Sequence, residues 1–143
     1  MRPGMCRLCG KRRRNPMIYG VGTDLVKVDR MQKSLASPSF WRRVFGEREQ
    51  SFLQSLGEKH QRESAAANFA AKEAFLKAAG TGIGGFALAE IQVLRKKSGA
   101  PFFELTGTAA QWAEEQSLHP HLSLSHDGGM AQAFVVLEQA ENA

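Results

Sequence analysis

Cysteine is scarce in this sequence and confined to one end. The 143 residues contain only two cysteines, Cys6 and Cys9. A Cys-x-x-Cys pair is half of a zinc site; no second pair completes it, and none of the four histidines has the spacing of a zinc finger. We therefore interpret the pair as two free thiols in a reducing cytoplasm.

Long apolar runs and a hydrolase motif are also missing. No uninterrupted apolar segment approaches the ~20 residues that a membrane-spanning helix needs, and no apolar region follows the N-terminal charges as in a signal peptide. No Ser/His/Asp series with a nucleophile elbow is present. The sequence predicts no membrane partner and does not support hydrolase chemistry.

Acidic residues are absent from the first sixteen positions, which hold six of the 19 basic residues. The remaining chain has 13 basic and 14 acidic residues, so the net charge of +5 belongs to the tail. We expect a disordered basic extension over residues 1–16 and one folded domain over residues 17–143, with no nucleic-acid partner. The alternative is a nucleic-acid-binding module led by the tail. Only such a module would lose its activity on truncation before Met17.

The order of predicted elements favours an α+β fold, with an antiparallel sheet packed on a long Ala-rich helix. That helix spans residues 59–79 and ends at Gly80, as a C-cap glycine would end it. We expect shorter helices from Asp29 and over 40–45, 47–56 and 108–116, and strands over 18–26, 87–95, 101–105, 121–125 and 131–137.

The first strand carries a candidate ligand-binding carboxylate. Alternation along it puts Gly20, Gly22 and Asp24 on one face. Two glycines beside an aspartate leave room for a close approach by a ligand or by another backbone segment. Asp24 is therefore either a ligand-facing carboxylate or a turn residue at the end of the strand.

The long helix carries a second candidate, because Glu73 shares a helix face with Phe69 and Leu76. A carboxylate in an apolar arc is costly unless a cation or hydrogen-bond donors compensate it. One interpretation is an i,i+4 ion pair with Lys77. The other is a magnesium site shared with Asp24, because Mg²⁺ needs only one or two carboxylates when phosphates and waters complete its shell.

Two further features are open to more than one interpretation. The run from Gly80 to Gly85 matches G-x-G-x-x-G, but it follows a helix instead of a strand, which excludes a dinucleotide-binding fold. It is either a tight turn that lets a ligand lie close to the main chain or a simple helix C-cap. His126 stands at the end of a predicted strand, where a lone histidine is usually structural or solvated.

Three segments together resemble the small bacterial holo-acyl-carrier-protein synthases. They are Ile18–Leu25 (IYGVGTDL), Phe69–Ala78 (FAAKEAFLKA) followed by Gly80–Ile83 (GTGI), and Leu122–Asp127 (LSLSHD). Each is weak or moderate alone, whereas three in order with family-like spacing are a strong match. The resemblance runs from about Met17 to Leu137.

This resemblance implies a magnesium-dependent phosphopantetheinyl transferase of fatty acid and lipid biosynthesis, with the 4'-phosphopantetheinyl transferase fold. The enzyme would be a cytoplasmic homotrimer with coenzyme A sites between adjacent subunits, and an acyl carrier protein would be its partner. The implied site residues have distinct roles: Asp24 and Glu73 hold Mg²⁺; Glu73 and Lys77 are catalytic; Lys77, Gly82, Ser125 and His126 bind coenzyme A; Arg30 and Arg43 face the carrier protein.

The implied reaction is attack of a carrier serine on the β-phosphate of coenzyme A, with 3',5'-ADP leaving. Positioning and electrostatics dominate such a transfer. Two acceptors stay open for the serine proton, Glu73 and a water held by the metal. A catalytically silent trimeric scaffold of the same fold is a further alternative, which the intact Asp24, Glu73 and Lys77 disfavour.

Position 68 departs from the resemblance, because it holds Asn68 where the family often has Arg. If that Arg normally holds phosphate, Lys72 or Arg62 would have to replace its charge. The segment from Asp24 to Arg48 has six basic residues against three acidic ones, and we predict that it is the docking face for an acidic carrier.

Overall fold

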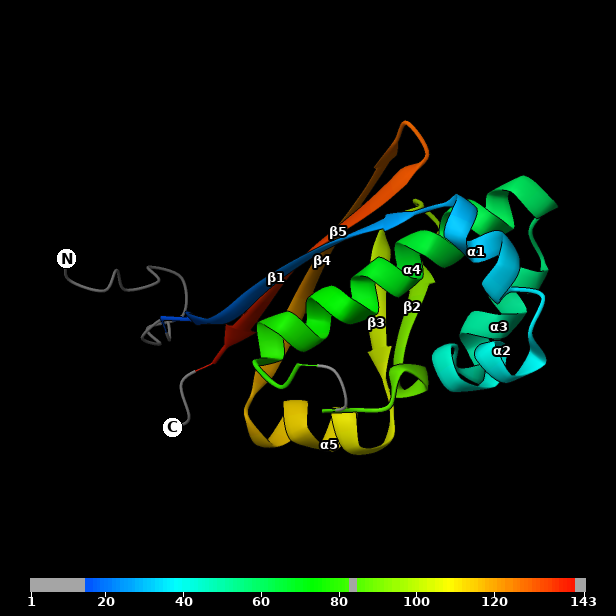
Figure 1. Ribbon diagram of the computed structural model, residues 1–143. Helices are drawn as coiled ribbons and strands as arrows, with labels where there is room; N and C mark the ends of the chain where they lie inside the picture. The colour runs from blue at the N-terminus through cyan, green and yellow to red at the C-terminus, as the bar shows by residue number, and fades with distance from the viewer. Residues whose placement is uncertain (1–14, 83–84, 141–143) are drawn as a thin grey trace.

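The computed structural model describes residues 15–82 and 85–140 and has the expected α+β architecture (Figure 1). Its elements follow the order β1 (Met17–Lys27), α1 (Asp29–Ser34), α2 (Pro38–Val44), α3 (Glu47–Gln54), α4 (Glu58–Ala79), the 3₁₀ turn η1 (Leu88–Glu90), β2 (Ile91–Arg95), β3 (Pro101–Leu105), α5 (Gly107–Glu115), β4 (Leu118–Asp127) and β5 (Met130–Gln139).

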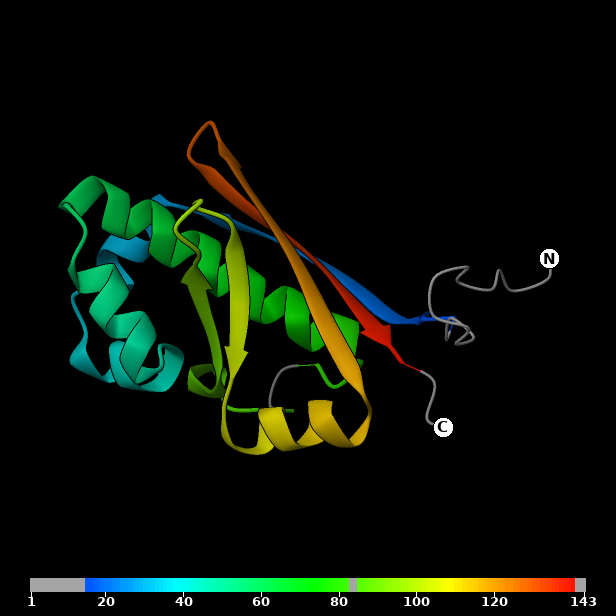
Figure 2. The same ribbon diagram turned by 180° about the vertical axis from the view of Figure 1, so that it is seen from behind.

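The described strands form two antiparallel sheets instead of one. The larger sheet has the order β1-β5-β4, and β2 pairs with β3 in a separate hairpin. In the larger sheet Asp24 is opposite Ala133 of β5, which in turn is opposite Leu124 of β4. Helix α4 crosses one face of this sheet, and the β4–β5 hairpin extends past it (Figures 1 and 2).

The predicted strand over residues 87–95 is wrong in its first half. Leu88 to Glu90 form η1, and the strand begins only at Ile91. Two bonds fix this turn, because Lys72 Nζ donates to Leu88 O at 2.9 Å and to Ile91 O at 2.6 Å. The conformation of η1 therefore depends on hydrogen bonds from α4, and the local sequence does not predict it.

Two glycines of β1 set the distance between the strand and helix α4. A Cβ on Gly20 would lie 2.0 Å from Ala78 O, and a Cβ on Gly22 would lie 1.9 Å from Ala74 O. Both positions therefore exclude any side chain, and helix backbone occupies the space. Of the two expected kinds of neighbour, ligand or backbone, it is the backbone that approaches these glycines.

The core lies between α4 and the surrounding strands. Eight alanines of α4 are buried: Ala65, Ala66, Ala67, Ala70, Ala71, Ala74, Ala78 and Ala79. Their small side chains let strands pack close to the helix axis, while Phe75 fills the remaining volume against the rings of Phe103 and Trp112. The Ala-rich composition of this helix thus serves packing as well as helix propensity.

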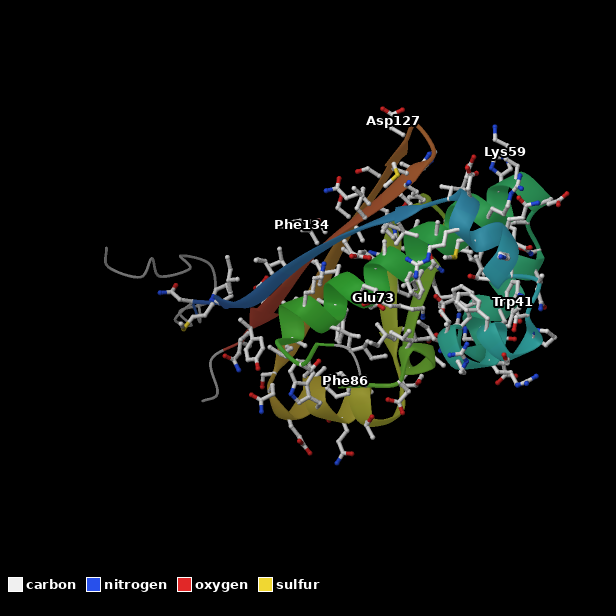
Figure 3. All side chains as sticks on the ribbon, in the orientation of Figure 1. Trp41, Lys59, Glu73, Phe86, Asp127 and Phe134 are labelled. Carbon is white, nitrogen blue, oxygen red and sulfur yellow. The ribbon has the colours of Figure 1, made fainter. Side chains whose placement is uncertain are left out.

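The opposite face of the larger sheet is apolar and exposed. Val21, Leu25 and Phe134 are 54%, 60% and 48% exposed on β1 and β5. Figure 3 shows Phe134 on the side of the sheet away from α4. Within the described residues, no helix is both long enough and apolar enough to span a membrane.

Candidate active site

Asp24, Glu73 and Lys77 lie together where β1 crosses α4. The Lys77 ammonium donates to Asp24 Oδ1 at 3.2 Å and to Thr23 O at 2.9 Å. Among the described residues, the ion pair of Lys77 within 4.0 Å is with Asp24 and not with Glu73. The proposed i,i+4 pair is therefore replaced by a contact between helix and strand, which the two glycines make possible.

Glu73 carries a perturbed carboxyl group. Burial raises the pKa of Glu73, the negative charge of Asp24 raises it further, and the positive charges of Lys77 and Arg30 act in the opposite direction. The residue lies in the C-terminal half of α4 (Figure 3) and is only partly exposed. Two neighbouring carboxylates, one of them partly desolvated, form a site that a cation would stabilise.

The donor set fits a hard cation bound jointly with a ligand. No cluster of three or more His, Cys, Asp or Glu side chains that could hold a metal occurs in residues 15–82 and 85–140. Two carboxylates cannot form a closed zinc-like site, but they match the small number of protein ligands that Mg²⁺ takes beside phosphate oxygens and water.

The glycine-rich turn begins at the end of α4, three residues after Lys77. Gly80 caps the helix in a left-handed conformation with φ of 77°, and Gly82 also has a positive φ, of 65°. A Cβ on Gly82 would meet nothing within 4 Å, so backbone conformation and not crowding requires glycine there. Positions 83 and 84 of the predicted turn lie outside the described residues.

Ser125 and His126 lie at the end of β4, away from the carboxylates. Both line a pocket of about 250 Å³ between α4, the β2–β3 turn and β4. His126 also lines a pocket of about 470 Å³ with Lys59 and Arg62 of α4. None of Asp24, Glu73 and Lys77 lines either pocket. Within one chain, the predicted site residues therefore form two separate groups.

The predicted docking residues are on the two short helices that follow β1 in the chain. Arg30 on α1 and Arg43 on α2 are both exposed. The charge of Arg30 acts on Glu73. Of the two predicted docking residues, Arg30 therefore lies near the carboxylate pair.

Lys72 does not supply the charge that Asn68 lacks. Its ammonium is fully buried, 2.7 Å from Glu49 Oε1, and burial lowers the pKa of Lys72 to about 8. Burial likewise raises the pKa of Glu49, against the influence of Lys72. The expectation that Lys72 could bind phosphate is wrong, because its ammonium is buried in an ion pair with Glu49. Arg62, the other candidate, lines the pocket beside His126.

This buried polar cluster and Arg95 were not predicted from the sequence. Glu49 Oε2 accepts from Asn68 Nδ2 at 3.0 Å and from Val93 N at 3.2 Å. Glu49 belongs to a short helix, where a glutamate is ordinarily solvated, so its sequence gives no signal. Of the cluster, only Lys72 could have been suspected from the sequence, because it precedes Glu73 in an otherwise apolar stretch of α4.

Comparisons with known proteins bear on the family of this chain. Residues 20–135 match the model of the 4'-phosphopantetheinyl transferase superfamily. The chain is 43% identical to a holo-[acyl-carrier-protein] synthase of Geotalea daltonii over 127 residues, covering 86% of this chain and 100% of that protein. It is 42% identical to the Treponema denticola protein of that name over 123 residues, covering 85% and 99%.

A solved structure gives the same result. The holo-(acyl-carrier-protein) synthase from Bacillus anthracis, in complex with CoA (3',5'-ADP), superposes with a TM-score of 0.74 at 34% identity, covering 87% of this chain and 99% of that one. The antiparallel α+β fold, the carboxylate pair on β1 and α4 and these matches lead to one conclusion. The chain belongs to the 4'-phosphopantetheinyl transferase superfamily.

Proposed function

We propose that this protein transfers the 4'-phosphopantetheine group of coenzyme A to a serine of an apo acyl carrier protein and releases 3',5'-ADP. The observation that carries the proposal is the convergence of Asp24, Glu73 and Lys77 at the crossing of β1 and α4. It is supported by relatives named for this activity and by the coenzyme complex of the Bacillus anthracis protein.

Asp24 and Glu73 would hold Mg²⁺ together with the diphosphate of coenzyme A. When bound, the metal neutralises charge that develops on the diphosphate oxygens. Burial raises the pKa of Glu73 and the neighbouring charge of Asp24 raises it further, and a cation beside the two carboxylates would offset both effects.

Lys77 supplies fixed positive charge beside this pair. Its ammonium donates to Asp24 Oδ1 and to Thr23 O, so the fold positions this charge beside the carboxylates. Preorganised charge of this kind lowers a barrier without reorganisation during the reaction. The open, left-handed backbone at Gly82 would let the coenzyme lie against the main chain at the end of the same helix.

Ser125 and His126 would line the adenosine end of coenzyme A. Because their pockets exclude the carboxylate pair, one chain does not join the two ends of the ligand site in a single pocket. This supports a site completed by a second copy, with the carboxylates of one subunit facing the β4 end of another.

The apolar sheet face supports assembly as a homotrimer. Val21, Leu25 and Phe134 are each about half exposed or more on β1 and β5. Contiguous exposed apolar residues of this kind are typical of a surface covered by another chain. Arg30 and Arg43 would remain outside this contact and face the carrier protein. A cytoplasmic location stays a prediction.

The test is the variant Glu73→Gln, which keeps the shape of the side chain and removes its charge. We expect transfer of phosphopantetheine to be abolished while the size of the assembly in solution is unchanged. Glu58→Gln is the matched control, because Glu58 is an exposed carboxylate at the start of the same helix. Near-normal turnover of Glu73→Gln would contradict the proposed role of this carboxylate.

A further inference from the structure

A second group of charged residues surrounds the pocket of about 250 Å³ near the end of β4. Helix α4 contributes His60 and Glu63, β4 contributes Ser125 and His126, and β2 contributes Arg95. No role has been assigned above to Arg95, which is the pocket's permanently charged cation.

Three contacts hold Arg95. Its Nη2 donates to Asn68 Oδ1 at 2.9 Å, its Nη1 donates to Leu94 O at 3.4 Å, and its guanidinium carbon lies 5.4 Å from the centre of the Phe52 ring. No carboxylate lies within 4.0 Å of it in the described part of the chain. Burial lowers the pKa of Arg95, while the charge of Glu49 acts in the opposite direction. A desolvated guanidinium with no carboxylate bound to it is suited to an incoming anion.

The orientation of Asn68 follows from its other contacts. Its Nδ2 donates to Glu49 Oε2 at 3.0 Å and to Val93 O at 3.1 Å, and both are acceptors. The amide oxygen must therefore point toward Arg95, where a donor is required. Asn68 is fully buried, so this arrangement is fixed by the core.

We propose that Arg95 binds the phosphate monoester on the ribose of coenzyme A, and that Asn68 positions its guanidinium. The inference rests on the proposed function. The diphosphate belongs at Asp24 and Glu73, which do not line this pocket, so the ribose phosphate is the remaining phosphate of the ligand. A planar guanidinium fixed by an amide and a ring can bind two phosphate oxygens at once. Positive charge is thus supplied from β2 instead of from position 68.

The experiment compares binding of coenzyme A and of 3'-dephospho-coenzyme A by calorimetry. We expect Arg95→Ala to weaken binding of coenzyme A by about 10- to 100-fold, as expected for lost charge-assisted hydrogen bonds. Binding of the dephospho form should not change. Arg95→Lys should restore only part of the preference, because an ammonium cannot form the same paired bonds. Lys97→Ala, which removes an exposed charge that does not line the pocket, should leave both affinities unchanged.

The positioning role has its own readout. Asn68→Ala should lower the preference for coenzyme A over the dephospho form in the same direction as Arg95→Ala. If Asn68→Ala does not fold, Phe52→Leu tests positioning, because it removes the ring beneath Arg95 and leaves the bonds of Glu49 intact.

Two results would overturn the inference: equal weakening of both ligands in Arg95→Ala, or an unchanged preference for coenzyme A in that variant. Failure of the proposed function would look different. The unmodified protein would then neither bind coenzyme A nor modify a carrier protein, whatever the behaviour of Arg95→Ala.

Discussion

Gly22→Ala should disrupt the fold and the site together. The added Cβ would lie 1.9 Å from Ala74 O, whereas ordinary van der Waals contact begins at 3.4 Å. Strand β1 and helix α4 must therefore move apart to make room for it. Overpacking of this kind costs about 1–3 kcal/mol, which for a domain of this size lowers the melting temperature by roughly 3–9 °C. Because Ala74 follows Glu73, the same shift moves this carboxylate away from Asp24.

The assay combines thermal unfolding with the rate of carrier modification under conditions where Gly22→Ala is fully folded. We expect a lower melting temperature and a rate reduced by at least the tenfold that small displacements of catalytic groups cost. Gly57→Ala is the matched control, because its φ is −63° and a Cβ there would meet nothing within 4 Å. A Gly22→Ala protein with the stability and rate of the Gly57→Ala protein would refute this explanation of the β1–α4 contact.

Three further predictions concern the core, the carrier and the assembly. Lys72→Met leaves the carboxylate of Glu49 buried without its cation and should cost about 3–5 kcal/mol in unfolding free energy, measured by denaturant titration; a change near zero would contradict the buried ion pair. Arg30→Ala should raise the Michaelis constant for an acidic carrier at low salt, with the effect fading as salt is added; an unchanged constant at low salt would remove Arg30 from the docking face. Phe134→Glu should convert the proposed trimer to monomers in light scattering and abolish transfer, whereas a trimer that persists would mean that this sheet face is not the subunit contact.

The helix and strand pattern could be predicted largely from local sequence signals. The Ala-rich helix ends at Gly80 because that residue takes the left-handed C-cap conformation. Alternation along β1 correctly placed Asp24 on the same face as the two glycines, whereas only the structure shows that α4 covers this face. Local signals could not predict η1, whose conformation depends on hydrogen bonds from Lys72.

The candidate site was predictable only in part, because its partners come from distant segments. Periodicity identified Asp24 and Glu73 as unusual carboxylates, but one of the two interpretations of Glu73, an ion pair with Lys77, is wrong. Lys77 contacts Asp24, 53 positions away in the chain, and only the packed fold reveals this. The contacts among Glu49, Asn68 and Arg95 could not be predicted either. The three residues come from different elements, and none of them is unusual within its own segment.

The decisive measurement is the intact mass of an apo acyl carrier protein incubated with this protein, coenzyme A and Mg²⁺, beside a parallel incubation with EDTA. We predict that the carrier gains the mass of one phosphopantetheine group, that 3',5'-ADP appears, and that EDTA prevents both. An unchanged mass for both an acyl carrier and a peptidyl carrier, each shown to be modifiable by another transferase, would contradict the proposed activity.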